Sequence, residues 1–251
     1  MKKQTITIGW LYPELMSIYG DRGNVICLQK RCELRDINVK VLLVGLQTTE
    51  KELASCDLLL MGGAQDSQQT IVSKDLVKKK KTLSSLIESG VPGVYICGAF
   101  QFLGKYYKEA DGTIIDGLGI FDLYTENPGN NFPRLIGNMA FDASGLLGIE
   151  KAMVGFENHG GRTYLGMGVS PLGRVIKGFG NNGEDGTEGS VYKNSIGTYS
   201  HGPILPKNPE IADWLIQKAL EKKYKQSIAL SPLDDTISQK AKQAILQRIL
   251  K

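Results

Sequence analysis

The chain has 251 residues, with 30 basic and 26 acidic side chains, a formal net charge of +4 and 41% apolar residues. These values are typical of a soluble globular protein with a full hydrophobic core and argue against disorder. The charge is too small and too dispersed to predict nucleic-acid binding. Because His159 and His201 are the only two histidines, the sequence excludes a histidine-rich metal site.

The cysteines, at positions 27, 32, 56 and 97, form no C-x-x-C pair and are too few for a disulfide framework. Residues 4–8 alternate polar and apolar side chains, which predicts a strand rather than the apolar part of a signal peptide. No run approaches the roughly 18 apolar residues of a membrane span. We therefore expect a cytoplasmic protein with reduced thiols.

The first hundred residues alternate short strands with helices. Strands are predicted over 4–10, 38–44, 57–61 and 93–96, and helices over about 24–36 and 74–89. This alternation indicates parallel βαβ units with right-handed crossovers.

The rest of the chain changes character. Residues 112–200 hold glycine-rich turns and short β-like runs such as 113–115 and 190–192, which predict antiparallel strands added to the parallel core. Helices are predicted over about 209–224 and 235–250. The last helix has one apolar face, formed by Ile237, Ala241, Ala244, Ile245 and Ile249. We expect an α/β domain over 1–208 and a helical extension over 209–251, packed on that domain or on a partner.

Cys97 stands where a buried strand is predicted to stop and a helix to start. A nucleophile on such a turn is exposed at the carboxyl edge of the sheet, where open α/β folds bind ligands. The backbone amides of Gly98 and of Gly63, which follows the strand over 57–61, are candidate oxyanion donors. The alternative is a small buried hydrophobe, the interpretation that burial statistics favour for the other three cysteines.

His201, at the end of a β-like run, is the preferred general base, and His159 in Asn158-His159-Gly160-Gly161 is the competitor. Composition alone does not separate the two. Arg134 offers a planar fork for a carboxylate, although a lone arginine is usually solvated. Lysines 78–81 are expected to form one solvated helical turn.

Cys97, Gly98, Gln101 and the distant His201 resemble the class I glutamine amidotransferases. That family has a G-x-C-x-G elbow and a glutamate two residues after the histidine; here the outer glycines are absent, and Gly202-Pro203 follow His201. These departures resemble the cobyric acid synthase-type branch, which works without that glutamate. Residues 19–24, 155–163 and 201–208 are further similar to glutaminase subunits in this branch that serve lipid II amidation, and the similarity spans about residues 6–210.

The resemblance implies a flavodoxin-like glutaminase that hydrolyses L-glutamine through a thioester on Cys97, with His201 as base and Gly63 and Gly98 as oxyanion donors. Arg134 would anchor the substrate and Gln101 would line the pocket. Ammonia would pass to a Mur ligase-like synthetase partner (MurT), which forms D-isoglutamine in lipid II. This chain would hold no cofactor or metal, because ATP and magnesium belong to the partner; no P-loop motif occurs here.

Several alternatives stay open. The missing triad acid is either supplied by the partner or not needed. The rival functions are a stand-alone cysteine hydrolase of γ-glutamyl or peptide bonds, an amidotransferase subunit for another acceptor, and a non-catalytic domain. The terminal helix is a candidate docking element or packs within the chain.

Overall fold

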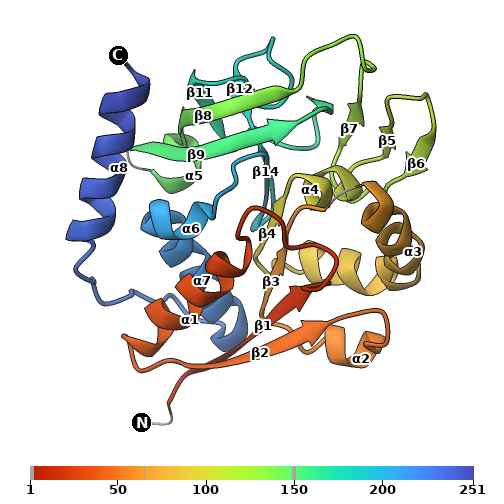
Figure 1. The fold of residues 1–251 in the computed structure, drawn as a ribbon. Helices are drawn as coiled ribbons and strands as arrows, with labels where there is room; N and C mark the ends of the chain where they lie inside the picture. The colour runs from red at the N-terminus through yellow and green to blue at the C-terminus, as the bar shows by residue number, and fades with distance from the viewer. Residues whose placement is uncertain (1–2, 65, 149–150) are drawn as a thin grey trace.

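The computed structural model describes residues 3–64, 66–148 and 151–251, and its centre is a six-stranded sheet (Figure 1). The strands lie in the order β13-β14-β4-β3-β1-β2. All neighbours are parallel except β13, which pairs antiparallel with β14. Their bounds are β1 Thr5–Leu11, β2 Asn38–Val44, β3 Leu58–Met61, β4 Gly93–Ile96, β13 Ser190–Tyr192 and β14 Ser195–Thr198. The predicted α/β fold with a mostly parallel sheet is confirmed.

Helices cover both faces of this sheet. Helices α1 (Arg22–Glu33) and α7 (Pro209–Tyr224) lie on one face, and α3 (Asp66–Glu88) lies on the other (Figure 1). The central strands β3 and β4 are buried along their whole length, as strands covered on both faces must be. Helix α3 begins eight residues before the predicted start at 74, because its first turns are polar and lack an apolar period. The short helix α2 spans Glu50–Leu53.

The described residues between 104 and 189 form two further sheets, where the sequence predicts added antiparallel strands over about 112–200. One has the order β10-β7-β5-β6 and the other the order β12-β11-β8-β9. All pairings are antiparallel except β5 with β7, which is parallel. Residues 190–192 form β13, which adds an antiparallel edge strand to the parallel core as predicted. The bounds are β5 Tyr106–Lys108, β6 Ile114–Asp116, β7 Leu123–Glu126, β8 Leu135–Asp142, α5 Ser144–Leu147, β9 Ala152–His159, β10 Arg162–Leu165, β11 Gly173–Lys177 and β12 Thr187–Glu188.

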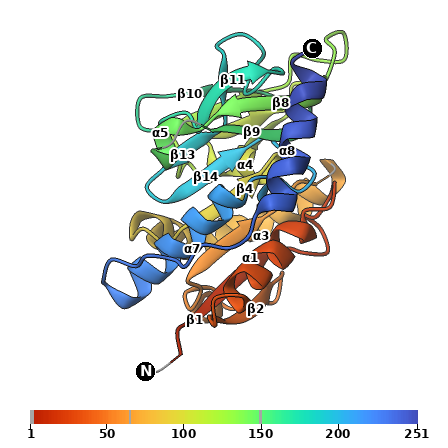
Figure 2. The same cartoon turned by 90° about the vertical axis from the view of Figure 1, so that its left-hand side faces the viewer.

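The C-terminal part comprises α6 (Ile204–Lys207), α7 and α8 (Thr236–Ile249). The apolar side of α7 is buried against the body, whereas α8 runs along the outside of the molecule (Figure 2). The predicted apolar face of α8 is wrong: Ile237 is 85% exposed, and Ala241 and Ala244 are exposed as well. Lys242 is the buried residue of this helix.

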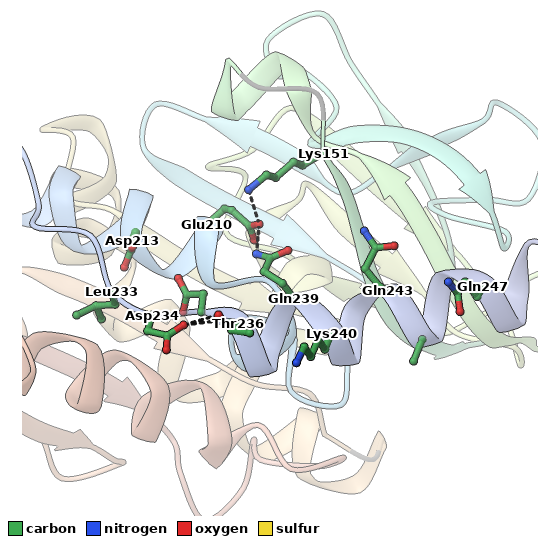
Figure 3. A pocket seen from close by; sticks show the side chains of 12 residues that line it. Lys151, Glu210, Asp213, Leu233, Asp234, Thr236, Gln239, Lys240, Gln243 and Gln247 are labelled. Carbon is green, nitrogen blue, oxygen red and sulfur yellow. Dashed lines mark hydrogen bonds and ion pairs between the residues drawn. The ribbon is translucent and has the colours of Figure 1, made fainter.

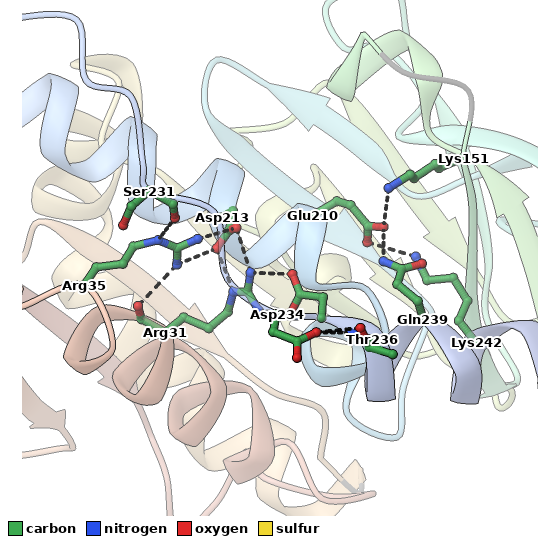
Figure 4. A network of polar contacts seen from close by, with 11 residues as sticks. Arg31, Arg35, Lys151, Glu210, Asp213, Ser231, Asp234, Thr236, Gln239 and Lys242 are labelled. Carbon is green, nitrogen blue, oxygen red and sulfur yellow. Dashed lines mark hydrogen bonds and ion pairs between the residues drawn. The ribbon is translucent and has the colours of Figure 1, made fainter.

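Polar contacts explain why α8 turns Lys242 inward. Its ammonium donates to Glu210 at 2.8 Å, and the Gln239 amide donates to the other carboxylate oxygen of Glu210, also at 2.8 Å. Figure 4 shows both side chains reaching from α8 to the start of α7. A charge-assisted hydrogen bond is stronger than a contact between small apolar side chains, so it sets the rotation of the helix.

A second polar cluster holds the segment that precedes α8. The Arg31 guanidinium binds Asp213 and Asp235, each at 2.6 Å, and Arg35 binds Asp213 at 2.7 Å and the carbonyl of Ser231 at 2.7 Å (Figure 4). These bonds join α1, α7 and the chain before α8. The division into a domain over 1–208 and an extension over 209–251 stays a prediction. Among the described residues, no helix is long and apolar enough to cross a membrane.

Candidate active site

Cys97 occupies a strained turn between β4 and α4 (Gly98–Leu103). Its backbone angles are φ 53° and ψ −108°, a region that side chains with a Cβ rarely adopt. The surrounding structure holds it there, since its amide donates to Thr198 at 2.8 Å and its carbonyl accepts from Gln101 at 3.0 Å. Strain of this kind costs about 1–3 kcal/mol and gathers at functional sites. The strand-to-helix turn predicted at Cys97 is thus present.

The other cysteines have ordinary structural surroundings. Cys32 and Cys56 are buried, and Cys27 is half-buried. Burial raises the pKa of each of these three thiols to about 12, so they are protonated and unreactive near neutral pH. This agrees with the core role predicted for them.

His201 reaches the same sheet edge as Cys97 because β14 runs parallel to β4. Thr198 pairs with Ile96, so the two chains leave the sheet side by side. The backbone amide of His201 then donates to Phe156 at 2.7 Å. Its ring is fully buried, and neither ring nitrogen forms a hydrogen bond with a described residue. Cys97 and His201 are therefore placed at one edge without a hydrogen bond between them.

A carboxyl group that the sequence analysis did not assign lies beside this histidine. Oδ1 of Asp21 is 4.0 Å from Nδ1 of His201, and both side chains are completely buried. Burial raises the pKa of Asp21 to about 7 and lowers the pKa of His201 to about 3. In the sequence, residues 19–24 predict only a turn. Their similarity to the related glutaminase subunits is the one signal that points to this segment.

Asp21 also contacts the glycine loop that follows β3. Its Oδ2 accepts the Gly63 amide at 2.9 Å, and a Cβ at Gly62 would lie only 2.4 Å from that oxygen. Gly62 must therefore remain glycine for the carboxyl to fit. Because the Gly63 amide donates to Asp21, it can bind an oxyanion only if this hydrogen bond breaks or becomes bifurcated. Gly98 follows Cys97 as expected, and both oxyanion roles stay predictions.

A cavity of about 190 Å³ opens in front of Cys97. It brings together three residues predicted for the site, Cys97, Gln101 and Arg134, while His201 does not line it. The cavity is lined by Ile18, Tyr19, Ala64, Gln69, Cys97, Gln101, Tyr107, Arg134, Asn158, His159, Gly160 and Gly161.

The polar side chains of this cavity differ in exposure to solvent. Arg134 is exposed and held by Asn158, with Nε 3.0 Å from the side-chain oxygen and Nη2 3.1 Å from the backbone carbonyl. Gln101 is buried and donates to the Tyr199 hydroxyl at 3.1 Å. A ligand that places a carboxylate on Arg134 can therefore extend inward to Cys97.

His159 lines the cavity at Cys97 and is held by its neighbours. Its Nδ1 lies 2.8 Å from the Gly161 carbonyl, and its Nε2 lies 3.5 Å from a carboxylate oxygen of Glu157. The ring stacks on Tyr199 with centroids 3.6 Å apart. One ring nitrogen of His159 is bonded to a backbone carbonyl, whereas neither ring nitrogen of His201 forms a hydrogen bond with a described residue, so the geometry favours His201 as the base.

A larger cavity lies elsewhere, along α8 (Figure 3). It measures about 750 Å³, and its lining includes Lys151, Glu210, Gln239 and Gln243. No cysteine or histidine belongs to its lining, so it offers no nucleophile or imidazole base. Over the described part of the chain, no group of three histidine, cysteine or acidic residues could hold a metal ion. The smaller cavity at Cys97 is therefore the candidate active site.

A cysteine on a strained elbow, a histidine at the end of the adjacent parallel strand and a glycine loop are the arrangement of a class I glutamine amidotransferase. The chain belongs to the CobB/CobQ-like glutamine amidotransferase family, whose model matches residues 7–209.

Relatives of this family resemble the chain over most of its length. It is 44% identical to the GatD subunit of lipid II isoglutaminyl synthase (glutamine-hydrolyzing) from Staphylococcus aureus (strain N315), over 97% of this chain and 96% of that protein. It is 42% identical to the GatD subunit from Streptococcus pneumoniae (strain ATCC BAA-255 / R6), over 93% and 88%. Among solved structures, a glutamine amidotransferase matches with a TM-score of 0.58 at 16% identity, over 84% of this chain and 98% of that one.

Proposed function

We propose that this protein is the glutaminase subunit of a two-subunit amidotransferase. It hydrolyses L-glutamine and supplies ammonia to a Mur ligase-like synthetase (MurT), which converts the D-glutamate of lipid II to D-isoglutamine. The observation that carries the glutaminase activity is the strained Cys97 facing a cavity, with His201 at the neighbouring strand end. The acceptor and the partner are supported by the similarity to two GatD subunits along nearly the whole chain.

In this mechanism Cys97 attacks the δ-carboxamide of glutamine. His201 takes the thiol proton and returns it to the departing ammonia, which leaves a γ-glutamyl thioester. The same histidine then activates water, which releases glutamate. The Gly98 amide stabilises the oxyanion. The Gly63 amide becomes a second donor when its hydrogen bond to Asp21 opens.

Arg134 positions the substrate by binding its α-carboxylate. The guanidinium already uses Nε and Nη2 on Asn158, and Nη1 would lie 3.3 Å from a Cβ built on Gly160, which lines the cavity. ATP and magnesium act in the synthetase, where the acceptor carboxylate is activated. In this proposal the glutaminase chain and the synthetase form a heterodimer in the cytoplasm.

The test uses the complex of this chain with its synthetase, supplied with lipid II, Mg-ATP and glutamine labelled with ¹⁵N in the side-chain amide. We expect the label in the D-isoglutamine of lipid II. The Cys97→Ala complex should lose this transfer but regain amidation when free ammonium is added. Amidation from glutamine that survives the loss of Cys97, or no ammonia release by the wild type, would refute the proposal.

A further inference from the structure

Gln69, near the start of α3, has a buried polar atom that its own chain does not satisfy. The side chain is 4% exposed and lines the cavity at Cys97. Its Nε2 donates to the carbonyl of Ala64 at 3.1 Å, whereas its Oε1 accepts no hydrogen bond from a described residue. Buried polar atoms are nearly always paired, so this oxygen indicates a ligand that brings a donor.

The orientation of this amide follows from its partner. A backbone carbonyl can only accept, so the nitrogen of Gln69 must face Ala64 and the oxygen must face away from it. The oxygen is therefore the end that Gln69 can offer to a ligand in the cavity.

The position of this amide is next to the reacting centre. A Cβ built on Gly98 would lie 3.1 Å from Nε2 and 3.6 Å from Oε1 of Gln69, so the amide packs against the residue that follows Cys97. Arg134 lines the same cavity and is exposed, whereas Gln69 is buried. A glutamine with its α-carboxylate on Arg134 and its carbonyl carbon at Cys97 can turn its side-chain NH₂ toward Gln69.

Three other polar side chains of the cavity have partners of their own, although Nε2 of His159 also forms no hydrogen bond with a described residue. Gln101 donates to Tyr199, Arg134 is bonded to Asn158, and His159 is bonded to Gly161. Oε1 of Gln69 is thus an acceptor in this lining that receives no hydrogen bond from a described residue.

We propose that Oε1 of Gln69 accepts a hydrogen bond from the side-chain NH₂ of the substrate and so selects an amide over a carboxylate. This inference rests on the proposed function, in which glutamine is the substrate. The δ-carboxylate of the product glutamate has only acceptors, which would oppose Oε1. Gln69 therefore discriminates substrate from product, since a site built for a donor rejects an analogue that lacks it.

The experiment compares two substrates of the glutaminase–synthetase complex: L-glutamine, and L-glutamate γ-methyl ester, which has no N–H at the leaving group. The variant Gln69→Met keeps the length of the side chain but removes its acceptor, together with the donor that bonds the Ala64 carbonyl; the loss of that donor affects both substrates alike. We expect its kcat/KM on glutamine to fall about ten- to a hundredfold, as for loss of one buried hydrogen bond. On the ester its kcat/KM should change less than about threefold. Inhibition by glutamate should strengthen in the same variant.

Gln68→Met is the matched control, because Gln68 is adjacent on α3 and does not line the cavity; both substrates should react as in the wild type. Unchanged kinetics of Gln69→Met, or equal losses on both substrates with a normal melting temperature, would overturn the inference while leaving the glutaminase activity intact. A wild-type complex inert toward both substrates would instead refute the proposed function.

Discussion

Oδ1 of Asp21 lies 4.0 Å from Nδ1 of His201, and the other oxygen of the same carboxyl group holds the amide of Gly63. One buried side chain thus contacts both the expected base and the loop expected to hold the oxyanion. The class I family places its orienting acid two residues after the histidine, where this chain has Pro203. Asp21 adds a carboxyl from the same chain to the two earlier options, a partner carboxylate and a working dyad.

The Asp21 carboxyl should make folding stability depend on pH. Burial raises its pKa from 3.8 to about 7 in the folded chain, so the folded state keeps a proton that the unfolded state releases. Relative to Asp21→Asn, the wild type should therefore lose stability as the pH rises from about 4 to 8. The full change is on the order of 4 kcal/mol. Urea unfolding across this range measures it. Asp116→Asn, at an exposed position, is the control, and a pH-independent difference for Asp21→Asn would contradict the prediction.

Replacing Cys97 should separate its chemistry from its backbone strain. Cys97→Ser and Cys97→Ala should abolish ammonia release, because neither offers a thiolate. Cys97→Gly should also be inactive, yet more stable than Cys97→Ala by about 1 kcal/mol, since glycine adopts a φ of 53° without strain. Glutaminase assays and urea unfolding measure the two effects. Turnover by the alanine variant would exclude Cys97 as the nucleophile.

The two histidines should differ in their effect on glutaminase activity. His201→Ala removes the only imidazole whose ring nitrogens are unbonded, and we expect a loss of at least about 10²-fold in kcat, as for a general base. His159→Ala loosens the wall next to Tyr199 and should retain part of the activity. Steady-state ammonia release by the complex compares them. A larger kcat loss in His159→Ala than in His201→Ala would reverse the assignment.

The buried ion pair of α8 should contribute to stability. Lys242→Met keeps the apolar stem but leaves Glu210 without its buried partner, and we expect a loss of about 1–3 kcal/mol. Lys240→Met, on an exposed position of the same helix, should change the stability by less than about 0.5 kcal/mol. Urea unfolding gives both values, and limited proteolysis reports detachment of α8. Equal effects of the two substitutions would show that the inward rotation of Lys242 contributes nothing.

The sequence predicts those parts of the fold that depend on neighbouring residues. The apolar run 93–96 followed by Cys97-Gly98 identifies a buried strand and a sharp turn, because both signals are local. The contact between Asp21 and His201 joins segments 180 positions apart, so no local pattern reveals it. Gln69 likewise stands among other polar residues in the sequence, and only the folded structure shows that it lines the cavity.

Two surface predictions are wrong because an ion pair decides which side chain of a helix turns inward. Lysines 78–81 were expected to be solvated, yet Lys79 is buried and paired with Asp75, which also accepts the Tyr12 hydroxyl at 2.8 Å. The face of α8 was likewise assigned by its apolar period, whereas Glu210 decides it. Asp75 lies one turn before Lys79 on the same helix, whereas the charge opposite Lys242 comes from the start of α7.

The bonds of Arg31 to Asp213 and Asp235 also place two attachments of the C-terminal segment on a single side chain. Arg31 lies on α1, Asp213 on α7 and Asp235 just before α8, so one guanidinium fastens two separate parts of the C-terminal segment to the first helix. Loss of this one side chain would remove both attachments at once. Residues 225–251 would then be held by fewer contacts and would be more open to proteases.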